Sequence, residues 1–539
     1  MGNSVSSSVL KKTPLTIATD TVVPLHRFDD TPLTRKVIVE FTMRFDDVLD
    51  PDKLRLSLEK LLSRRDWRKL GARLRLNFDG KLEYHIPEFF DEKRPAFAYS
   101  HIQHEMDIAR HPTGSRLPRP TASPAVLCDP EDFAPLLRRW GGPRRLSDYL
   151  YTDAPQLSLH VVSFADATVV SLSWPHTLLD AMGRRELLDA WVATLEGRDG
   201  DVKPLLGVLH DPLAPLGTAP QEPYVLSHRR LSPWQALMFA IAYIWTTLFW
   251  WRGEETRMVC VPAAHIRSLH QGALDYLAAA QQSEEDHGRY SDEEKKIKPF
   301  VSEGDVLSSW IARLALLHLR REDGSNGDQT VSILNAFGMR SVLARDLLPP
   351  THAYVGNAVA GVYAFVAARD LFARPLGFAA AAVRRSIAEQ GTRAQVEARA
   401  AVDLRRRGRS AVYGDPGMAP IMISNWSKAR FFDTDFSAAV VARPGTNLGR
   451  RSNKIGRPSY IQPNGLVAGI PTRNSFPIVG KDAASNYWFE GTLGRGLWGQ
   501  VQEAMDLEHR YLTHQFESAQ GNGVAESNGG GDGQVLLNF

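Results

Sequence analysis

Residues 173–183 read SWPHTLLDAMG, and this stretch sets a histidine at the end of an apolar strand and an aspartate four residues later. The apolar residues of 168–174 predict that strand, and residues 184–195 have the apolar spacing of a helix. His176 therefore falls at a strand-to-helix junction, a usual place for exposed functional groups. A histidine there is suited to moving a proton in an acyl-transfer reaction.

The same spacing recurs at His26 and Asp30. With 16 histidines in the chain, about one such match is expected by chance, so the spacing alone is weak evidence. Before His26 there is only a short apolar run, which Pro24 breaks, and a charged segment follows it. His26 is therefore interpreted as a structural histidine, and the candidate site is placed at His176.

The length of 539 residues indicates two domains, and the composition excludes several classes of function. A formal charge of +3 over 539 residues argues against general nucleic-acid binding. Cys128 and Cys260 are the only cysteines, so neither a disulfide framework nor a metal site is expected, and a reduced, cytoplasmic location fits. Residues 1–6, MGNSVS, match the pattern for myristoylation of Gly2, the alternative being an unmodified terminus.

Strand and helix patterns divide the chain at a proline-rich stretch. Residues 1–215 are predicted to form a first αβ domain, with a hairpin across Asp79-Gly80, and residues 257–518 a second. In the second, Ser302 is predicted to cap a helix with Asp305, and the charged run 281–298 is predicted to be a loop. The segment 216–256 connects the domains, and the Gly-, Asn- and Ser-rich tail 519–539 is predicted to be disordered.

The connecting segment contains an uncharged, apolar run at 231–251. It is long enough to span a bilayer, with arginines outside it and tryptophans at both ends. The alternative is a helix that packs between the domains or lies on a membrane surface.

Further motifs follow His176 in a fixed order. Residues 339–357 contain Arg340, a double proline and the run YVGN; ISNW occupies 423–426; and DTDFSAA occupies 433–439. Together they resemble the BAHD acyltransferases and their HxxxDG signature, particularly the fungal relatives that act on secondary metabolites. The resemblance covers residues 15–515, with two departures. The signature glycine is displaced to Gly183, and the family's glycine-tryptophan-glycine is missing after Phe436.

The resemblance implies an α+β fold of the chloramphenicol acetyltransferase type, with two domains, each a mixed, mostly antiparallel sheet with flanking helices. It implies O-acyl transfer, most commonly of acetyl, from acyl-coenzyme A to a hydroxyl of a terpenoid, polyketide or alkaloid. Coenzyme A enters as a co-substrate of a monomer, with no bound cofactor, no metal and no covalent acyl-enzyme.

It also implies roles for individual residues. His176 is the expected general base, and Asp180 is expected to pair with Arg340. Ser424 or Trp426 is expected to donate a hydrogen bond to the oxyanion, Trp426 alternatively forming a pocket wall. The remaining expected roles are loop geometry at Gly183 and Asp435. Apart from the resemblance, the basic residues Arg450, Arg451, Lys454 and Arg457 are a candidate contact for coenzyme A phosphates, the alternative being a solvated loop.

This shared site bears on the apolar run, because His176 precedes it and Ser424 follows it. A single membrane crossing would separate the two residues, so a packed or interfacial helix at 231–251 is expected, with peripheral membrane contact left open.

Two alternatives remain. A condensation-type enzyme that uses a carrier-protein thioester would share the fold, although such enzymes usually carry a second histidine where Pro175 stands. A catalytically silent, metabolite-binding relative is the other alternative, since Ser437-Ala438-Ala439 departs from the family's motif.

Overall fold

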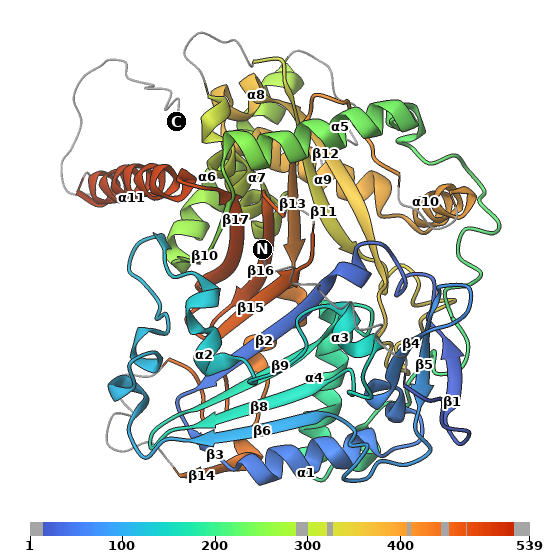
Figure 1. The fold of residues 1–539 in the computed structure, drawn as a ribbon. Coiled ribbons are helices and arrows are strands. Elements are labelled where there is room, and N and C mark those ends of the chain that lie inside the picture. Colours follow the sequence, from blue (N-terminus) through green and yellow to red (C-terminus); the bar gives the residue numbers. More distant parts are fainter. Residues whose placement is uncertain are drawn as a thin grey trace, which may run out of the picture.

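The computed structural model describes residues 14–286, 300–320, 327–406, 411–442, 452–469 and 472–521. Two sheets form its framework and lie one above the other in Figure 1. The expectations for Gly2, for Arg450 and Arg451, for 287–298 and for 522–539 fall outside the described residues.

The first sheet has five strands in the order β15-β2-β9-β8-β6. All its pairs are antiparallel except β6 with β8. Helices α1 (Pro51–Leu62) and α4 (Ala181–Leu195) pack against each other and share the core of this half. The strands are β2 (Val37–Phe45), β6 (Ala98–Gln103), β8 (Ser158–Ser163), β9 (Thr168–Pro175) and β15 (Tyr460–Val467).

The second sheet has seven strands in the order β12-β11-β13-β16-β17-β10-β7. Only β11 with β13 and β13 with β16 run parallel, so the expected fold class, two mixed and mostly antiparallel sheets, is confirmed. The strands are β7 (Ala125–Val126), β10 (Glu254–Val261), β11 (Thr330–Gly338), β12 (Val359–Ala367), β13 (Ala419–Asn425), β16 (Ser475–Lys481) and β17 (Tyr487–Gly494).

Helices α6, α7 and α9 pack on one another against the second sheet. The helices of this half are α6 (Ala263–Asp286), α7 (Glu303–Ala315), α8 (Ala368–Ala373), α9 (Leu376–Gln390), α10 (Arg393–Arg405) and α11 (Leu497–Gly521). Two short helices, α2 (Ala134–Leu137) and α3 (Leu146–Leu150), and a small sheet of β1 (Thr21–Pro24), β5 (Leu82–Ile86) and β4 (Arg73–Leu76) complete the first half.

The two halves exchange strands. β15 comes from late in the sequence but pairs with β2 in the first sheet, whereas β7 comes from early in the sequence and pairs with β10 in the second. β14 (Val440–Ala442) likewise pairs with β3 (Val48–Leu49). Each half is therefore completed by strands from the other side of the apolar run.

The predictions of a hairpin and of a helix cap are confirmed, because the residues of turns and caps are specific. The hairpin β4–β5 turns at Asp79-Gly80, with Gly80 at φ 71°, and Ser302 and Asp305 form a reciprocal capping box at α7. The prediction of a loop from 281 is wrong at its start, because α6 continues to Asp286. Residues 281–286 read QQSEED and contain no glycine or proline to end the helix. α11 similarly reaches Gly521, inside the predicted tail.

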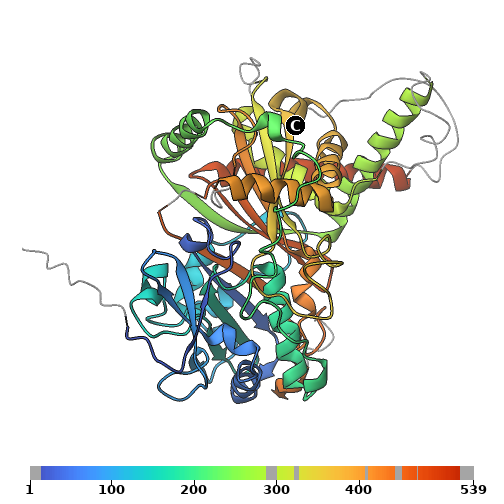
Figure 2. The same ribbon diagram turned by 90° about the vertical axis from the view of Figure 1, so that its right-hand side faces the viewer.

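The apolar run forms α5 (Pro233–Trp245) and a π-helical turn over Thr246–Trp250. Ser232 caps it reciprocally with Gln235, and Pro233 occupies its first turn. Among the described residues, no helix combines the length and apolarity that a membrane crossing needs. In Figure 2, α5 (green) lies at the periphery of the second sheet, on the side opposite α6 (yellow-green).

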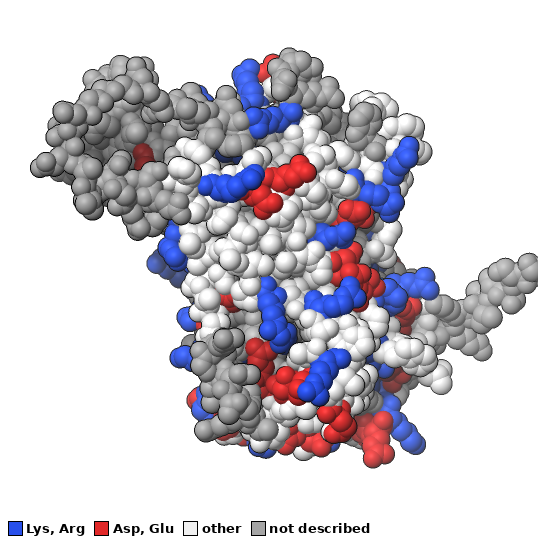
Figure 3. All heavy atoms as spheres, turned by 90° about the vertical axis from the view of Figure 1, so that its left-hand side faces the viewer, with Lys and Arg blue, Asp and Glu red and all other residues white. Residues whose placement is uncertain are grey.

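Charges are mixed over the surface. On the face in Figure 3, basic and acidic side chains are interspersed, and the described residues there form no continuous basic surface. The small net charge is thus not concentrated on this face as a nucleic-acid site would require.

Candidate functional site

His176 follows the last residue of β9, and its backbone N–H donates to the Val37 carbonyl of β2 at 2.9 Å. The side chain is only partly exposed, and its Nδ1 is buried with no hydrogen-bond partner among the described residues. Burial lowers the pKa of His176; the charge of Arg184 lowers it further, while Asp180 opposes the shift. The ring is therefore neutral at neutral pH, the form a general base needs.

Asp180 connects the start of α4 to the second half of the chain. One carboxylate oxygen accepts from the Gly183 N–H at 2.7 Å, which caps the helix. Both oxygens accept from the Arg340 guanidinium at 2.8 Å, and the Ala358 N–H adds a bond of 3.0 Å. Asp180 is 4% exposed, so its charge is fully engaged with these groups rather than with water.

The YVGN segment lies against the start of α4, where it contacts Gly183 and accepts hydrogen bonds from Arg340. Arg340 also donates to the carbonyls of Tyr354 and Gly356, at 3.1 and 2.7 Å. A Cβ at Gly183 would lie 1.9 Å from the Val355 carbonyl oxygen. Only glycine permits this close approach, which accounts for a glycine at this later position in the signature.

Asn357 holds the loop that carries His176, although no separate role for Asn357 was predicted from the sequence. Its backbone N–H and its Nδ2 donate to one Asp29 oxygen at 2.7 and 2.9 Å, and Nδ2 also donates to the His176 carbonyl at 2.9 Å. Asp29 is completely buried, and this burial raises its pKa to about 6. Asp29 and Asn357 are 328 residues apart, and no spacing in the sequence indicates their contact.

His26 lies close to Asp29 but is enclosed. It is 4% exposed, neither ring nitrogen has a hydrogen-bond partner among the described residues, and burial lowers its pKa to about 3. In the second histidine–aspartate match, the histidine is therefore neutral and buried.

Ser424 and Trp426 lie at the end of β13 and contact each other. The indole Nε1 of Trp426 donates to the Ser424 Oγ at 2.8 Å. Since an indole has one N–H donor, Trp426 has no further hydrogen bond to donate. The hydroxyl hydrogen of Ser424 is the donor left for a ligand.

Arg184 is a buried cation beside Trp426 that the motifs in the sequence did not single out. Its guanidinium carbon lies 3.8 Å from the ring centre of Phe41, 4.1 Å from Phe431 and 4.6 Å from Trp426. It is 1% exposed, its Nε and Nη2 have no hydrogen-bond partner among the described residues, and burial lowers its pKa to about 9. Arg184 therefore contacts Trp426 of the Ser424–Trp426 pair, and its positive charge also lowers the pKa of His176.

Asp435 shapes the segment after the ISNW strand. It accepts from the Ser437 N–H at 3.0 Å and lies 3.5 Å from Arg457, while the adjacent Phe436 packs edge-on against Trp191. Arg457 also pairs with Asp433, so its charge is already balanced by two carboxylates.

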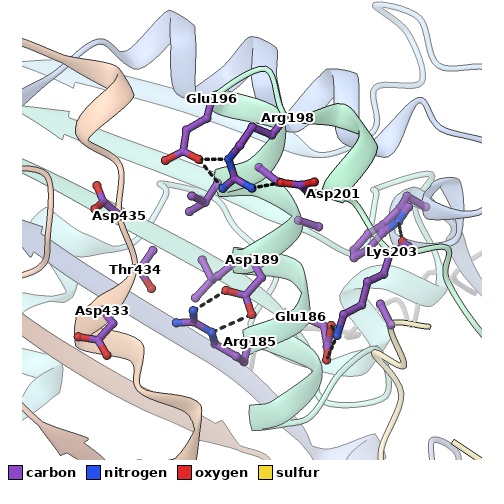
Figure 4. Close-up of a pocket in the computed structure, with 16 residues that line it drawn as sticks. Arg185, Glu186, Asp189, Glu196, Arg198, Asp201, Lys203, Asp433, Thr434 and Asp435 are labelled. Atoms are coloured by element: carbon purple, nitrogen blue, oxygen red, sulfur yellow. Dashed lines mark hydrogen bonds and ion pairs between the residues drawn. The ribbon is translucent and has the colours of Figure 1, made fainter. Parts of the chain in front are cut away.

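A surface hollow lies on the outer face of α4 and is lined by charged side chains (Figure 4). Its cations are paired within it, Arg185 with Asp189, Arg198 with Glu196 and Asp201, and Lys203 with Glu186. Neither His176 nor the Ser424–Trp426 pair lines this hollow. Over the part of the chain that is described, no cluster of His, Cys, Asp and Glu is arranged to hold a metal.

Sequence comparisons extend over nearly the whole chain. A family profile described as Transferase family matches residues 270–448. Acetyltransferase adrJ of Penicillium rubens is 40% identical over 502 residues, 92% of this chain and 98% of its own. The protein named Transcriptional regulator calD of Penicillium decumbens is 43% identical over 494 residues, covering 91% and 96%.

Among solved structures, the fold is similar to that of F. graminearum TRI101 complexed with ethyl coenzyme A. The TM-score is 0.61 at 12% identity, over 90% of this chain and 97% of that one. Vinorine synthase is similar with a TM-score of 0.51 at 12% identity, over 90% and 92%.

Proposed function

The chain belongs to the BAHD-type acyltransferases, and on this premise we propose that it moves an acyl group, preferentially acetyl, from acyl-coenzyme A to a hydroxyl of a small secondary metabolite. One observation carries the proposal: His176 is partly exposed, on a loop held by Asp180, Arg340 and Asn357. The relatives named acetyltransferase support acetyl as the group, and the complex of TRI101 with ethyl coenzyme A supports coenzyme A as its carrier.

In this mechanism, Nε2 of His176 takes the proton from the acceptor hydroxyl, because Nδ1 is enclosed. The oxygen attacks the thioester carbonyl carbon and forms the new C–O bond. The carbon–sulfur bond then breaks, and the imidazolium returns the proton to the departing thiolate. A positioned base of this kind contributes about 10²- to 10⁴-fold in rate.

The Ser424 hydroxyl donates to the oxyanion of the tetrahedral intermediate, and Trp426 positions it by holding Oγ. One such donor is worth about 3–4 kcal/mol. Trp426 is thus assigned a positioning role in place of a donor role.

We place the enzyme in the cytoplasm as a monomer. Two of the relatives carry the name transcriptional regulator, but a formal net charge of only +3 does not suit nucleic-acid binding, and acidic and basic side chains are mixed on the one face that Figure 3 shows. The engaged Asp180 and the neutral His176 favour a working enzyme over a silent binding protein.

The test is transfer by the purified chain. Acetyl- and butyryl-coenzyme A are incubated with a panel of terpenoid, polyketide and alkaloid alcohols, and both free coenzyme A and acylated product are measured. Product that forms without any carrier protein, and that His176→Ala fails to make, supports the proposal. Coenzyme A binding without turnover across the panel would favour the silent alternative.

A further inference from the structure

Helix α5 and its π-helical turn expose apolar side chains that soluble proteins normally bury. No side chain of α5 is buried. Six large side chains that recur at helical spacing on one face are each 49–67% exposed: Trp234, Leu237, Ile241, Trp245, Leu248 and Phe249. A contiguous apolar face of this kind marks an interaction surface.

The opposite face of α5 is directed at the second half of the molecule. Phe239, Tyr243 and Thr246 line a hollow there, and the Tyr243 hydroxyl donates to the Arg473 carbonyl at 2.7 Å. The outward face of the helix is therefore uncovered, and its inward face is only partly covered. A helix that is apolar all round is stable only when its surroundings are also apolar.

The attachment of α5 determines how it meets a partner. Before the helix, the Leu231 N–H donates to the Val412 carbonyl, and after it the chain enters β10 of the second sheet. Both ends are thus held by the same half of the molecule, so the helix lies along the surface, as Figures 1 and 2 show. Tryptophans near both ends are typical of helices that lie in the interface of a bilayer.

The charged residues nearest to each end of the segment are arginines, and Glu254 and Glu255 follow only after Gly253. Arg229, Arg230 and Arg252 flank it, are exposed, and form no ion pair within the described ranges. The run 231–251 contains no acidic residue. An apolar strip between arginines complements a membrane with acidic headgroups.

The hollow beneath α5 favours a lipid over a folded protein. Arg473 borders it and forms no ion pair with any described residue, and its Nε is buried without a hydrogen-bond partner among them. Trp251 Nε1 and His318 Nδ1, from two further lining residues, are also buried and unpartnered within the described residues. Apolar walls beside a guanidinium that is unpaired among the described residues suit a molecule that has an anionic head and an apolar chain.

We propose that α5 docks this enzyme on the surface of a lipid bilayer that carries acidic lipids, with the helix parallel to the membrane and one acidic lipid reaching Arg473. This docking goes beyond acyl transfer and does not depend on it. It would hold the enzyme where apolar acceptor molecules concentrate.

The test is flotation of the full chain with vesicles of phosphatidylcholine, with and without phosphatidylserine. Wild type is expected to float with the acidic vesicles, and Leu237→Glu with Ile241→Glu to reduce the bound fraction at least about tenfold, because charges enter the bilayer at high cost. Leu56→Glu on α1 is the matched control, since Leu56 is 53% exposed and Leu237 is 49% exposed. Both Leu56→Glu and the inactive His176→Ala should float as wild type does.

Arg473→Gln should reduce the preference for acidic over neutral vesicles, and an unchanged preference would refute the role of Arg473. Wild type that floats with neither vesicle, or a double variant that floats equally well, would overturn the docking. So would sedimentation in which wild type is a dimer, the double variant is a monomer and neither floats, because the face would then join two copies of the chain.

Discussion

His176 and Asp180 lie four residues apart but have separate partners, so substitutions should separate chemistry from folding. His176→Ala is expected to fold and to lose about 10²- to 10⁴-fold in turnover. Asp180→Asn still caps α4 but leaves Arg340 without its counter-charge, and breaking a buried pair costs about 3–5 kcal/mol. Thermal unfolding and steady-state rates of both variants measure this. Full activity in His176→Ala would refute the role of His176 as the general base.

The pH dependence of the reaction should report the enclosure of His176. Burial and the Arg184 charge both disfavour the protonated ring, so the acid limb of kcat/KM should lie below the ordinary histidine pKa of 6.5. Arg184→Met removes the cation, raises the pKa of His176 and should move the limb to higher pH. A wild-type limb at or above 6.5, or no movement in the variant, would contradict this electrostatic account.

The contact between Trp426 and Ser424 predicts graded losses. Ser424→Ala removes the free donor and should lower kcat about 10²- to 10³-fold. Trp426→Phe keeps an aromatic ring but releases Oγ, so its loss should be smaller. In the double variant, Trp426→Phe should add little to Ser424→Ala, because it acts through the same hydroxyl. Additive losses would show instead that Trp426 acts independently.

At the scale of elements, the start of α4 depends on a glycine that lies against another backbone. Gly183→Ala would force its Cβ against the Val355 carbonyl, so the YVGN segment must shift, and both thermal stability and activity should fall. Gly272→Ala is the matched control within helix α6, because nothing lies within 4 Å of its Cβ position. The control should gain about 1 kcal/mol, and equal effects of the two variants would contradict the packing argument.

Elements governed by local chemistry were predictable from the sequence. β9, α4 and the hairpin at Asp79-Gly80 follow from periodicity and turn residues, and the α7 cap follows from Ser302 and Asp305. The transfer of β15 to the first sheet was not predictable, because strand pairing over a long sequence distance leaves no periodic signal.

The same difference holds at the site. The Asp180–Arg340 contact was expected only because an ordered series of motifs resembled a family. The contacts of Asn357 with Asp29 and of Arg184 with Trp426 depend on side chains that the fold brings together, and no spacing in the sequence indicates them.

At the scale of the whole molecule, the exchanged strand β15 should couple a late segment of the chain to the first sheet. Ile461 lies in β15 opposite Met43 of β2 and is fully buried, so Ile461→Ala should cost about 2–5 kcal/mol. Hydrogen exchange should then rise in β2 and β9, although both precede the substitution by hundreds of residues. Ile333→Ala, equally buried in β11, is the control and should loosen β12 and β13 instead. Exchange that rises only in the second sheet for both variants would show that β15 does not stabilise the first.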